Sequence, residues 1–502
     1  MSAAELEQAG EAFPNIWSID FQNNAPDFDF NTAGGTNWEV GDEGEVGIIV
    51  AVDYGSKFRN KFGQRSSYKA SSATDSGLEA DRDFSPRACE AVGVDGSECG
   101  YDVTTWDIDL NTFTSLGWQI NADHAIKYSS LLLRSSQKQV EIQQGRTNSE
   151  DLANFTRLDW TERQVWSHSF DGEHAFDIFN DDMTEIFWHA NSTKAKRDVP
   201  MRKRYTYVYD NNSGAFEMLR RNDSNRIEFG ALDDTSKDIG FDVKQPFYIN
   251  STALDFKFGA SYNEKNRVSD YKKYGFNLAN VSNDELRTFV PEVIFGSVNI
   301  DPNGIYLDEF FDASSAFTAD FENKQFFAQV DAQVNDQVRV SAGMRYEDSL
   351  QTVMSTDRTT LEDITIRQDL EKWLPSATVT WEFIENMQVR LAYSETVNRP
   401  DSRELAPVFF VREDGRTERG NENLKPANIR SFDARFEWYF GTGESLTIGA
   451  FYKEIDNPIE QSIFARGDGE ADTIANAEKA KLKGFELELE KVIGTVGARE
   501  FF

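Results

Sequence analysis

The sequence predicts an all-β protein: an antiparallel transmembrane β-barrel that is incomplete, with about fifteen strands visible, short periplasmic turns and long extracellular loops. Three observations carry this prediction. Apolar and polar side chains alternate along most of the 502 residues, short and long connections alternate between these segments, and only 39% of the residues are hydrophobic. No apolar run reaches the roughly twenty residues that a membrane-spanning helix needs, whereas a barrel strand needs an apolar residue only at every second position.

The alternation is clearest in the second half of the chain. Apolar side chains occupy every second position in 326–332 and again in 338–346, and the turn "VNDQ" separates the two segments. A period of two is that of a β-strand whose faces meet different surroundings. The same pattern predicts further strands through Ile48, Val50, Val52 and Tyr54; Leu254, Phe256, Phe258, Ala260 and Tyr262; Ala377, Val379, Trp381 and Phe383; Val389, Leu391 and Tyr393; Phe432, Ala434, Phe436, Trp438 and Phe440; and Leu446, Ile448, Ala450 and Tyr452.

The lengths of the connections favour a membrane barrel over a soluble β-sandwich. Tight turns are predicted at 121–124, 334–337, 384–387 and 441–444. Long polar stretches are predicted at 264–323, 350–372, 398–428 and 454–482. A sandwich also buries one face of each strand, but it has no reason to place every long connection at the same end of the hairpins. An outer-membrane barrel does, because its periplasmic turns are short and its extracellular loops are long.

The first part of the chain is less regular. Residues 1–45 are predicted to be an irregular segment that leads into the barrel, and 46–502 are predicted to form the partial barrel. The spacing of Cys89 and Cys99 would suit a loop-closing disulfide in an oxidising compartment, with two free thiols as the alternative. Zinc would need further ligands, and no histidine is close in sequence.

The charge and the missing motifs exclude several classes of function. A formal net charge of −34 argues against nucleic-acid binding, which depends on basic contacts to phosphates. Acidity of this kind suits solvation, and a cation-attracting surface is the alternative. The sequence contains no GxSxG, GxxxxGK[ST] or HExxH motif, so we predict neither an enzyme nor a cofactor or metal site. The four histidines, which suit surface or girdle positions better than ligand positions, are His124, His168, His174 and His189.

Four ordered segments resemble the C-terminal barrel of TonB-dependent outer-membrane receptors. They are 391–407 (LAYSETVNRPDSRELAP), 419–440 (RGNENLKPANIRSFDARFEWYF), 449–463 (GAFYKEIDNPIEQSI) and 474–490 (IANAEKAKLKGFELELE). In that family a strand ending in a Ser-x-Thr-x-x-Arg-Pro-like segment precedes a loop with a Gly-Asn-x-x-Leu-Lys-Pro motif. The matching positions here are Ser394, Thr396, Arg399, Pro400, Gly420, Asn421, Leu424, Lys425 and Pro426.

The resemblance implies a receptor in the outer membrane of a Gram-negative bacterium that binds a scarce nutrient at its extracellular loops and moves it into the periplasm. The expected partners are outer-membrane lipid, a small ligand such as a siderophore, vitamin or saccharide, and the TonB complex, which acts in the family through a plug domain. The plug, the TonB-contacting box and the final strands are not visible in the sequence, and 1–10 lacks the zones of a secretory signal. We therefore expect a fragment truncated at both ends.

One loop offers candidate ligand-binding residues. The arginines that follow the strand at 388–397 are Arg399, Arg403, Arg412, Arg416 and Arg419. Guanidinium groups suit anionic ligands such as carboxylates or phosphates. Acidic residues interleave with these arginines, so ion pairs within the loop are the alternative, and the sequence favours them. Two other functions stay open at this point: a passive porin-like channel, and a secreted soluble β-protein that binds carbohydrate.

Overall fold

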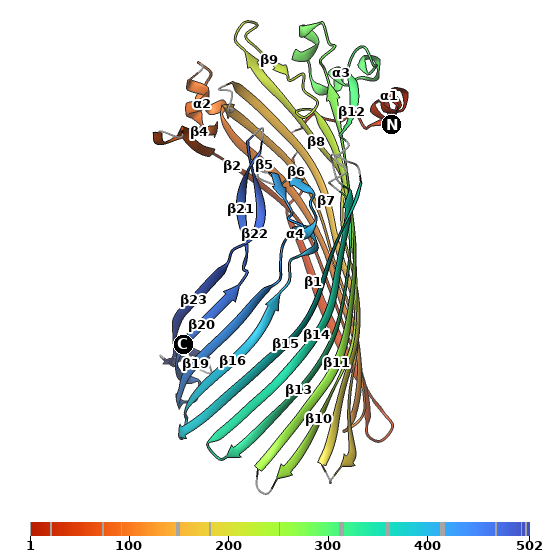
Figure 1. Cartoon of the computed structure of the whole chain (residues 1–502). Coiled ribbons are helices and arrows are strands. Elements are labelled where there is room, and N and C mark those ends of the chain that lie inside the picture. Colours follow the sequence, from red (N-terminus) through yellow and green to blue (C-terminus); the bar gives the residue numbers. More distant parts are fainter. Residues whose placement is uncertain are drawn as a thin grey trace.

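The computed structural model describes residues 2–20, 23–72, 75–91, 93–146, 151–179, 182–249, 252–310, 316–356, 362–411, 417–466, 469–492, 494–496 and 499–501. Long antiparallel strands form one sheet in which each strand pairs with the next, as Figure 1 shows. In order they are β1 (Phe28–Val40), β2 (Gly44–Gly63), β5 (Gly100–Asn121), β6 (His124–Arg146), β7 (Leu152–Phe179), β8 (Asp182–Asp210), β10 (Arg226–Ile249), β11 (Thr252–Asn277), β13 (Phe317–Asn335), β14 (Val338–Thr356), β15 (Asp363–Ile384), β16 (Met387–Asn398), β19 (Ala427–Gly441), β20 (Glu444–Asp456) and β23 (Lys479–Glu490).

Shorter elements lie in the connections. The short strands are β3 (Arg65–Ser72), β4 (Asp75–Phe84), β9 (Ala215–Met218), β12 (Tyr306–Phe310), β17 (Phe409–Val411), β18 (Thr417–Arg419), β21 (Ile459–Arg466), β22 (Gly469–Asn476), β24 (Gly494–Val496) and β25 (Arg499–Phe501). The helices are α1 (Ala3–Ala12), α2 (Pro86–Glu90), α3 (Pro291–Ile294) and α4 (Ser402–Leu405), with 3₁₀ turns η1 (Gly96–Glu98), η2 (Asp284–Thr288) and η3 (Ser297–Asn299). In the described ranges no helix combines the length and the apolar character that a membrane crossing requires.

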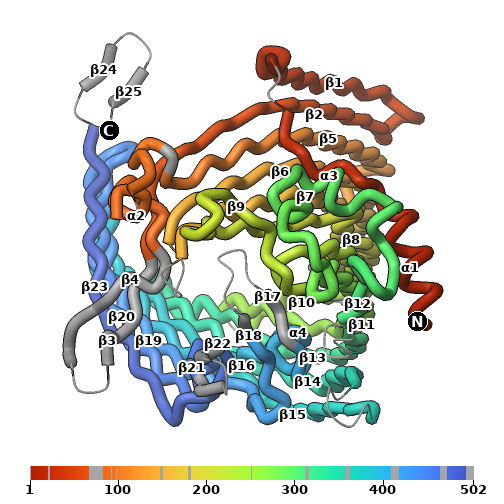
Figure 2. Tube along the Cα trace, turned by 90° about the horizontal axis from the view of Figure 1, so that it is seen from above, coloured from red at the N-terminus to blue at the C-terminus, as the bar shows by residue number. Residues whose placement is uncertain are grey.

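Short turns and long connections lie at opposite ends of the strands (Figure 1). Two of the short turns contain residues in the left-handed region, Asn386 at φ 65° and Gly443 at φ 69°. Asparagine and glycine tolerate this conformation, which lets a strand reverse within a few residues. Figure 2 shows the sheet curving round, with β1 and β23 as its two ends. Among the described residues β1 pairs only with β2, and β23 only with β20, so the barrel is open between them.

The two faces of the sheet differ as the alternation predicts. In Figure 2 the helix α4 lies inside the curve, and its residue Leu405 packs against Phe317 and Val353, so these two mark the inner face. The opposite, outer face carries exposed large apolar side chains toward the short turns, and we call them the apolar band. Its members include Trp118, Trp166, Phe170, Ile239, Phe241, Phe326, Trp381, Leu391, Phe485 and Leu487. The predicted antiparallel barrel-type fold is confirmed.

The strands are longer than the sequence predicts. Strand β7 has 28 residues and β8 has 29, whereas about ten tilted residues cross a bilayer. Much of the predicted loop at 350–372 is therefore strand, since β14 runs to Thr356 and β15 starts at Asp363. Beyond the apolar band the outward positions of β15 are polar, as at Arg367, Asp369 and Glu371, so the outward apolar alternation stops although the backbone ladder continues.

The N-terminal part also differs from the expectation of an irregular segment. Strand β1 lies within 1–45 and pairs along its whole length with β2. Its sequence, FDFNTAGGTNWEV, has apolar residues at every second position only near its ends, because Gly34 and Gly35 interrupt the pattern. Further on, in 60–112, Cys89 and Cys99 form a disulfide with a Cα–Cα distance of 5.7 Å, which joins α2 to the residue after η1.

The segment before β1 packs on the outer face at the long-loop end. Trp17 is 1% exposed and contacts Tyr205 and Phe276. Lys203 is fully buried beside it: its Nζ donates a hydrogen bond to the carbonyl of Ile16 at 2.8 Å and lies 4.7 Å from the centre of the Trp17 ring. Burial lowers the pKa of Lys203 to about 8.

Candidate functional site

The candidate site is a group of charged side chains on the inner face, at the long-loop end and beyond the apolar band. Three arginines stand in one register row across neighbouring strands: Arg157 of β7 faces Arg204 of β8, which faces Arg226 of β10. We call them the arginine row. Residues at every second position of a strand share a face. The next row on the inner face, two positions closer to the short turns, therefore holds Asp159, Arg202 and Glu228.

The carboxylates of this second row balance part of the positive charge. Arg202 places Nη2 at 2.7 Å and Nε at 2.9 Å from one carboxylate oxygen of Asp159. Glu228 is 2% exposed and lies 2.7 Å from Nε of Arg226 and 3.6 Å from Nη1 of Arg202. The hydroxyl of Tyr271, on β11, also donates a hydrogen bond to Glu228. A buried carboxylate is tolerated only with such partners.

The pKa values follow from burial and from these contacts. Burial by itself would raise the pKa of Glu228, but Arg226, Arg204 and the Tyr271 hydrogen bond outweigh it and hold the pKa at about 2. Burial lowers the pKa of Arg204 to about 10, and the neighbouring arginines repel its charge further, although Glu228 opposes them. Burial and the charge of Glu228 raise the pKa of Tyr271. At neutral pH Glu228 is therefore ionised and Arg204 remains a cation.

Arg204 is the member of the row with the least compensation. The Nε atoms of all three arginines are buried and make no hydrogen bond to the described residues, so the difference lies in their ion pairs. Arg157, by contrast, lies 3.4 Å from Glu141, and Arg226 lies 2.7 Å from Glu228. A guanidinium that is charged, short of acceptors and flanked by two more guanidiniums is suited to an anion with several oxygen atoms.

Arg399, the first arginine predicted to bind ligand, anchors its loop to the inner face. Its Nη2 lies 2.6 Å from the carboxylate of Glu347, and its Nε donates to Ser349 at 3.1 Å. Its guanidinium also lies over the ring of Phe321 at 5.9 Å. A second contact joins loop and wall, because Arg267 of β11 lies 3.0 Å from Asp401.

The other predicted arginines are spread through the loop. Arg403 lies 3.9 Å from Glu418, and Arg419 lies 3.6 Å from Glu422. Arg412 and Arg416 lie outside the described residues. Arg403 and Arg419 thus have carboxylate neighbours within the loop, whereas the carboxylate beside Arg399 is that of Glu347 on β14. A role for these arginines in ligand binding stays a prediction.

The loop after Arg399 folds inward and forms a small core on the inner face. Leu405, Val408 and Leu424 are buried against Phe317 and Val353. The close turn at Gly420 makes this possible, and the family motif contains this glycine. A Cβ atom there would lie 2.0 Å from the carbonyl oxygen of Ala406 and 2.7 Å from that of Arg403.

We expect Gly420→Ala to loosen this loop by about 1 to 3 kcal/mol, because the added methyl group forces the backbone apart. Limited proteolysis of the purified chain measures the effect as faster cleavage within 402–424. Gly117→Ala is the matched control, since a Cβ atom at Gly117 meets nothing within 4 Å. Equal cleavage rates for the two variants would contradict the prediction.

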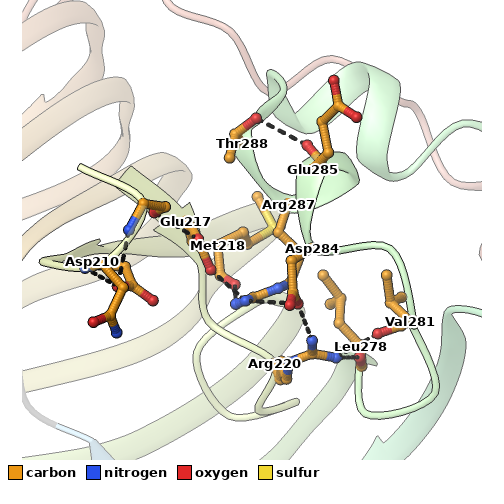
Figure 3. A network of polar contacts seen from close by, with 12 residues as sticks. Asp210, Glu217, Met218, Arg220, Leu278, Val281, Asp284, Glu285, Arg287 and Thr288 are labelled. Carbon is orange, nitrogen blue, oxygen red and sulfur yellow. Dashed lines mark hydrogen bonds and ion pairs between the residues drawn. The ribbon is translucent and has the colours of Figure 1, made fainter. Parts of the chain in front are cut away.

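A second polar network holds the connection between β11 and β12 against β9 (Figure 3). Arg287 forms ion pairs with Glu217 and with Asp284, and its Nη1 donates to the carbonyl of Met218 at 3.0 Å. Arg220 pairs with Asp284 and donates to the carbonyl of Val281 at 2.6 Å. The network fixes this connection at the long-loop end of the sheet, farther from the short turns than the arginine row.

The sequence contains a signal for the arginine row, although we did not predict the row from it. In "MRKRYTY" (201–207), Arg202 and Arg204 alternate with Lys203 and Tyr205, and in "RIEF" Arg226 and Glu228 do the same. Period two places each set on one strand face. Nothing local shows that the sets meet, because that depends on register between strands. Within the described part of the chain, no three histidine, cysteine, aspartate or glutamate side chains are grouped to hold a metal ion.

Comparison with known proteins extends these observations. Residues 100–498 match the family model described as "TonB dependent receptor-like, beta-barrel". The siderophore receptor PiuA from Acinetobacter baumannii superposes with a TM-score of 0.51 at 14% identity, over 94% of this chain and 62% of that one. The ferric-catecholate import receptor Fiu from E. coli K12 gives 0.49 at 13% identity, over 94% and 63%. The chain thus spans less than two thirds of either structure. No sequence among the curated proteins matches it.

Proposed function

The chain belongs to the TonB-dependent receptors of the Gram-negative outer membrane through their β-barrel domain, and we propose that it takes part in the uptake of a small anionic nutrient, most simply a negatively charged metal chelate. The ligand enters from the long-loop end and is held at the arginine row. The pull of the TonB complex on a plug domain supplies the energy for its passage into the periplasm. Family membership supports this energy source, and the siderophore receptor PiuA shares the fold.

The arginine row is the observation that carries the choice of ligand charge. The chain as a whole has a formal charge of −34, so an unselective surface would repel an anion. Four guanidiniums, Arg157, Arg202, Arg204 and Arg226, nevertheless share one inner patch with the carboxylates of Glu141, Asp159 and Glu228. This group has one more guanidinium than carboxylate, and it lies partly buried on the inner face of the curved sheet. Charge–charge attraction is stronger in such a partly desolvated place than in bulk water.

We expect the purified full chain in detergent to bind a ferric tris-catecholate, which is an anion, at least about tenfold more tightly than an uncharged ferric tris-hydroxamate. Arg204→Gln should weaken anion binding by about 10- to 100-fold, because a hydrogen bond to a charged group contributes about 1.5 to 3 kcal/mol. It should leave hydroxamate binding unchanged. Quenching of tryptophan fluorescence by the bound ferric chelates measures both affinities.

Arg367→Gln is the matched control, because Arg367 is exposed on the outer face and pairs only weakly with Asp369 at 3.0 Å. Its binding should equal that of the unchanged chain. Equal affinity for both chelates, or an anion affinity that Arg204→Gln does not alter, would contradict the proposed ligand charge. Uptake of the chelate that persists in cells without a working TonB complex would contradict the energy source instead.

A further inference from the structure

The outer face of β6, β7 and β8 carries a group of cations next to the apolar band, on the side away from the short turns. Register places Arg134 of β6 beside Gln164 of β7, and Gln164 beside Lys196 of β8. One step closer to the short turns, Trp166 stands beside Lys194. We call Arg134, Gln164, Lys194 and Lys196 the cationic patch. Neighbouring strands are about 4.8 Å apart, so these side chains can reach a common ligand.

The members of the cationic patch are accessible. The side chains of Arg134, Lys194 and Lys196 are 51%, 54% and 39% exposed. The amide of Gln164 lies between them and can donate a further hydrogen bond. Lys138 lies on the same face farther from the short turns, 5.0 Å from the centre of the Trp160 ring and 5.5 Å from that of Trp106. Lysine and tryptophan in this arrangement are typical of the boundary between hydrocarbon and water.

The acidic neighbours of the cationic patch leave its cations available to a ligand. Arg134 lies 3.3 Å from Glu162, while Lys194 and Lys196 lie 3.6 and 3.3 Å from the same oxygen of Asp233. Asp198 faces outward beside Glu162, farther from the apolar band. Exposed ion pairs contribute at most about 1 kcal/mol each. A ligand with a doubly charged phosphate can therefore compete for the cations, and the single carboxylate of Asp233 serves two lysines.

We propose that the cationic patch binds the phosphate of anionic membrane lipids whose acyl chains lie along the apolar band. The order of the side chains along the strands supports a lipid as the ligand. Starting from the short turns, apolar side chains such as Trp166 and Phe170 come first, then the cations, and then the carboxylates of Glu162 and Asp198, with Lys138 and Trp160 one step beyond them. An amphiphile with its chains toward the short turns meets apolar, cationic and hydrated surroundings in the same order. Basic groups near a membrane surface attract anionic lipid by about 1 kcal/mol each.

The test uses the purified full chain in dodecyl maltoside and counts bound lipid by native mass spectrometry. Phosphatidic acid, whose headgroup is a bare phosphate, is compared with zwitterionic phosphatidylcholine of the same acyl chains. Soluble glycerol 3-phosphate serves as the third ligand. We expect phosphatidic acid to bind at least about fivefold more tightly than phosphatidylcholine, and glycerol 3-phosphate not to displace it at equal concentration, because it lacks the contacts with the apolar band.

Two variants should change this preference in opposite directions. Lys194→Gln should weaken binding of phosphatidic acid by about fivefold. Asp233→Asn frees two lysines and should strengthen it by about two- to fivefold. Lys272→Gln, an exposed lysine on the outer wall that lies farther from the short turns, is the control and should have no effect. A variant that merely disturbed the fold could not strengthen binding.

Three results would overturn the proposal: equal binding of the two lipids, no gain with Asp233→Asn, or displacement of the lipid by glycerol 3-phosphate at equal concentration. The last result would indicate a site for free phosphate. Failure of this test leaves the proposed function untouched, because the cationic patch lies on the outer face and the arginine row on the inner one.

Discussion

Replacement of Glu228 by glutamine is expected to destabilise the long-loop end of β8 and β10 by about 3 to 5 kcal/mol, the range for breaking a buried ion pair. Glu228 is 2% exposed, and its carboxylate faces Arg226 and Arg202 and accepts a hydrogen bond from Tyr271. Glutamine keeps the shape but removes the charge, so the repulsion between Arg204 and Arg226 is no longer offset by Glu228, and Arg202 keeps only Asp159 as its ion-pair partner among the described residues.

Hydrogen exchange of the purified chain measures this loss locally. Amides of 200–206 and 226–230 should exchange faster in Glu228→Gln, while those of β13 and β14 keep their protection. Glu264→Gln, on the outer face of β11, is a suitable control because it removes a carboxylate that lies outside the cluster. Unchanged exchange in 226–230 would show that Glu228 does not stabilise the site.

The same carboxylate predicts a dependence on pH. Its pKa is held at about 2, below the ordinary value of 4.5, so the folded state favours the charged form. The resulting stabilisation, about 3 kcal/mol for such a shift, is fully present above pH 4.5 and is lost as the pH falls from 4.5 through 2. Protection of 226–230 should fall in this window, and Glu228→Gln should show a much smaller change. An equal fall in the variant would assign the effect to other groups.

Arg399→Ala is expected to release the inward-folded loop, with a cost of about 1.5 to 3 kcal/mol for its docking, the range for a hydrogen bond to a charged group. Glu347 has a side chain only 5% exposed, and the substitution removes the guanidinium at 2.6 Å and leaves only that of Arg345, 2.9 Å away and 46% exposed. The hydrogen bond to Ser349 is lost as well. Faster hydrogen exchange in α4 and in 418–424 measures the release.

Two variants test whether the buried charge is the cause. Arg399→Met combined with Glu347→Gln removes both charges and should regain much of the protection, since replacing a whole buried pair costs little. Arg419→Ala breaks an ion pair in which both side chains are 37% exposed and should change the docking by less than about 1 kcal/mol. If Arg399→Ala were as mild as Arg419→Ala, the anchor would lie elsewhere in the loop.

The hairpins could be predicted from the sequence because their signal is local. The alternation in 326–332 and 338–346 predicts two strands and a turn, and β13 and β14 pair with Val330 opposite Ala342. The alternation of Val389, Leu391 and Tyr393 likewise predicts the outer face of β16, where Leu391 is 52% exposed. The lengths of the strands beyond the apolar band could not be predicted, because outward positions such as Arg367, Asp369 and Glu371 of β15 are polar there while the backbone hydrogen bonds continue the ladder.

The sequence by itself determined the fold class, the outward and inward side of each amphipathic strand, and the family, through the motif from Ser394 to Pro426. The tertiary structure decided which inward side chains meet. Arg157, Arg204 and Arg226 form one row only because of the register in which β7, β8 and β10 pair. That register changes at a bulge between Trp160 and Glu162, and the row lies on the long-loop side of this bulge. A shift of one residue would turn each side chain to the other face. Periodicity is a property of a single strand, whereas a site is a property of several, and that is why the arginine row emerged only from the structure.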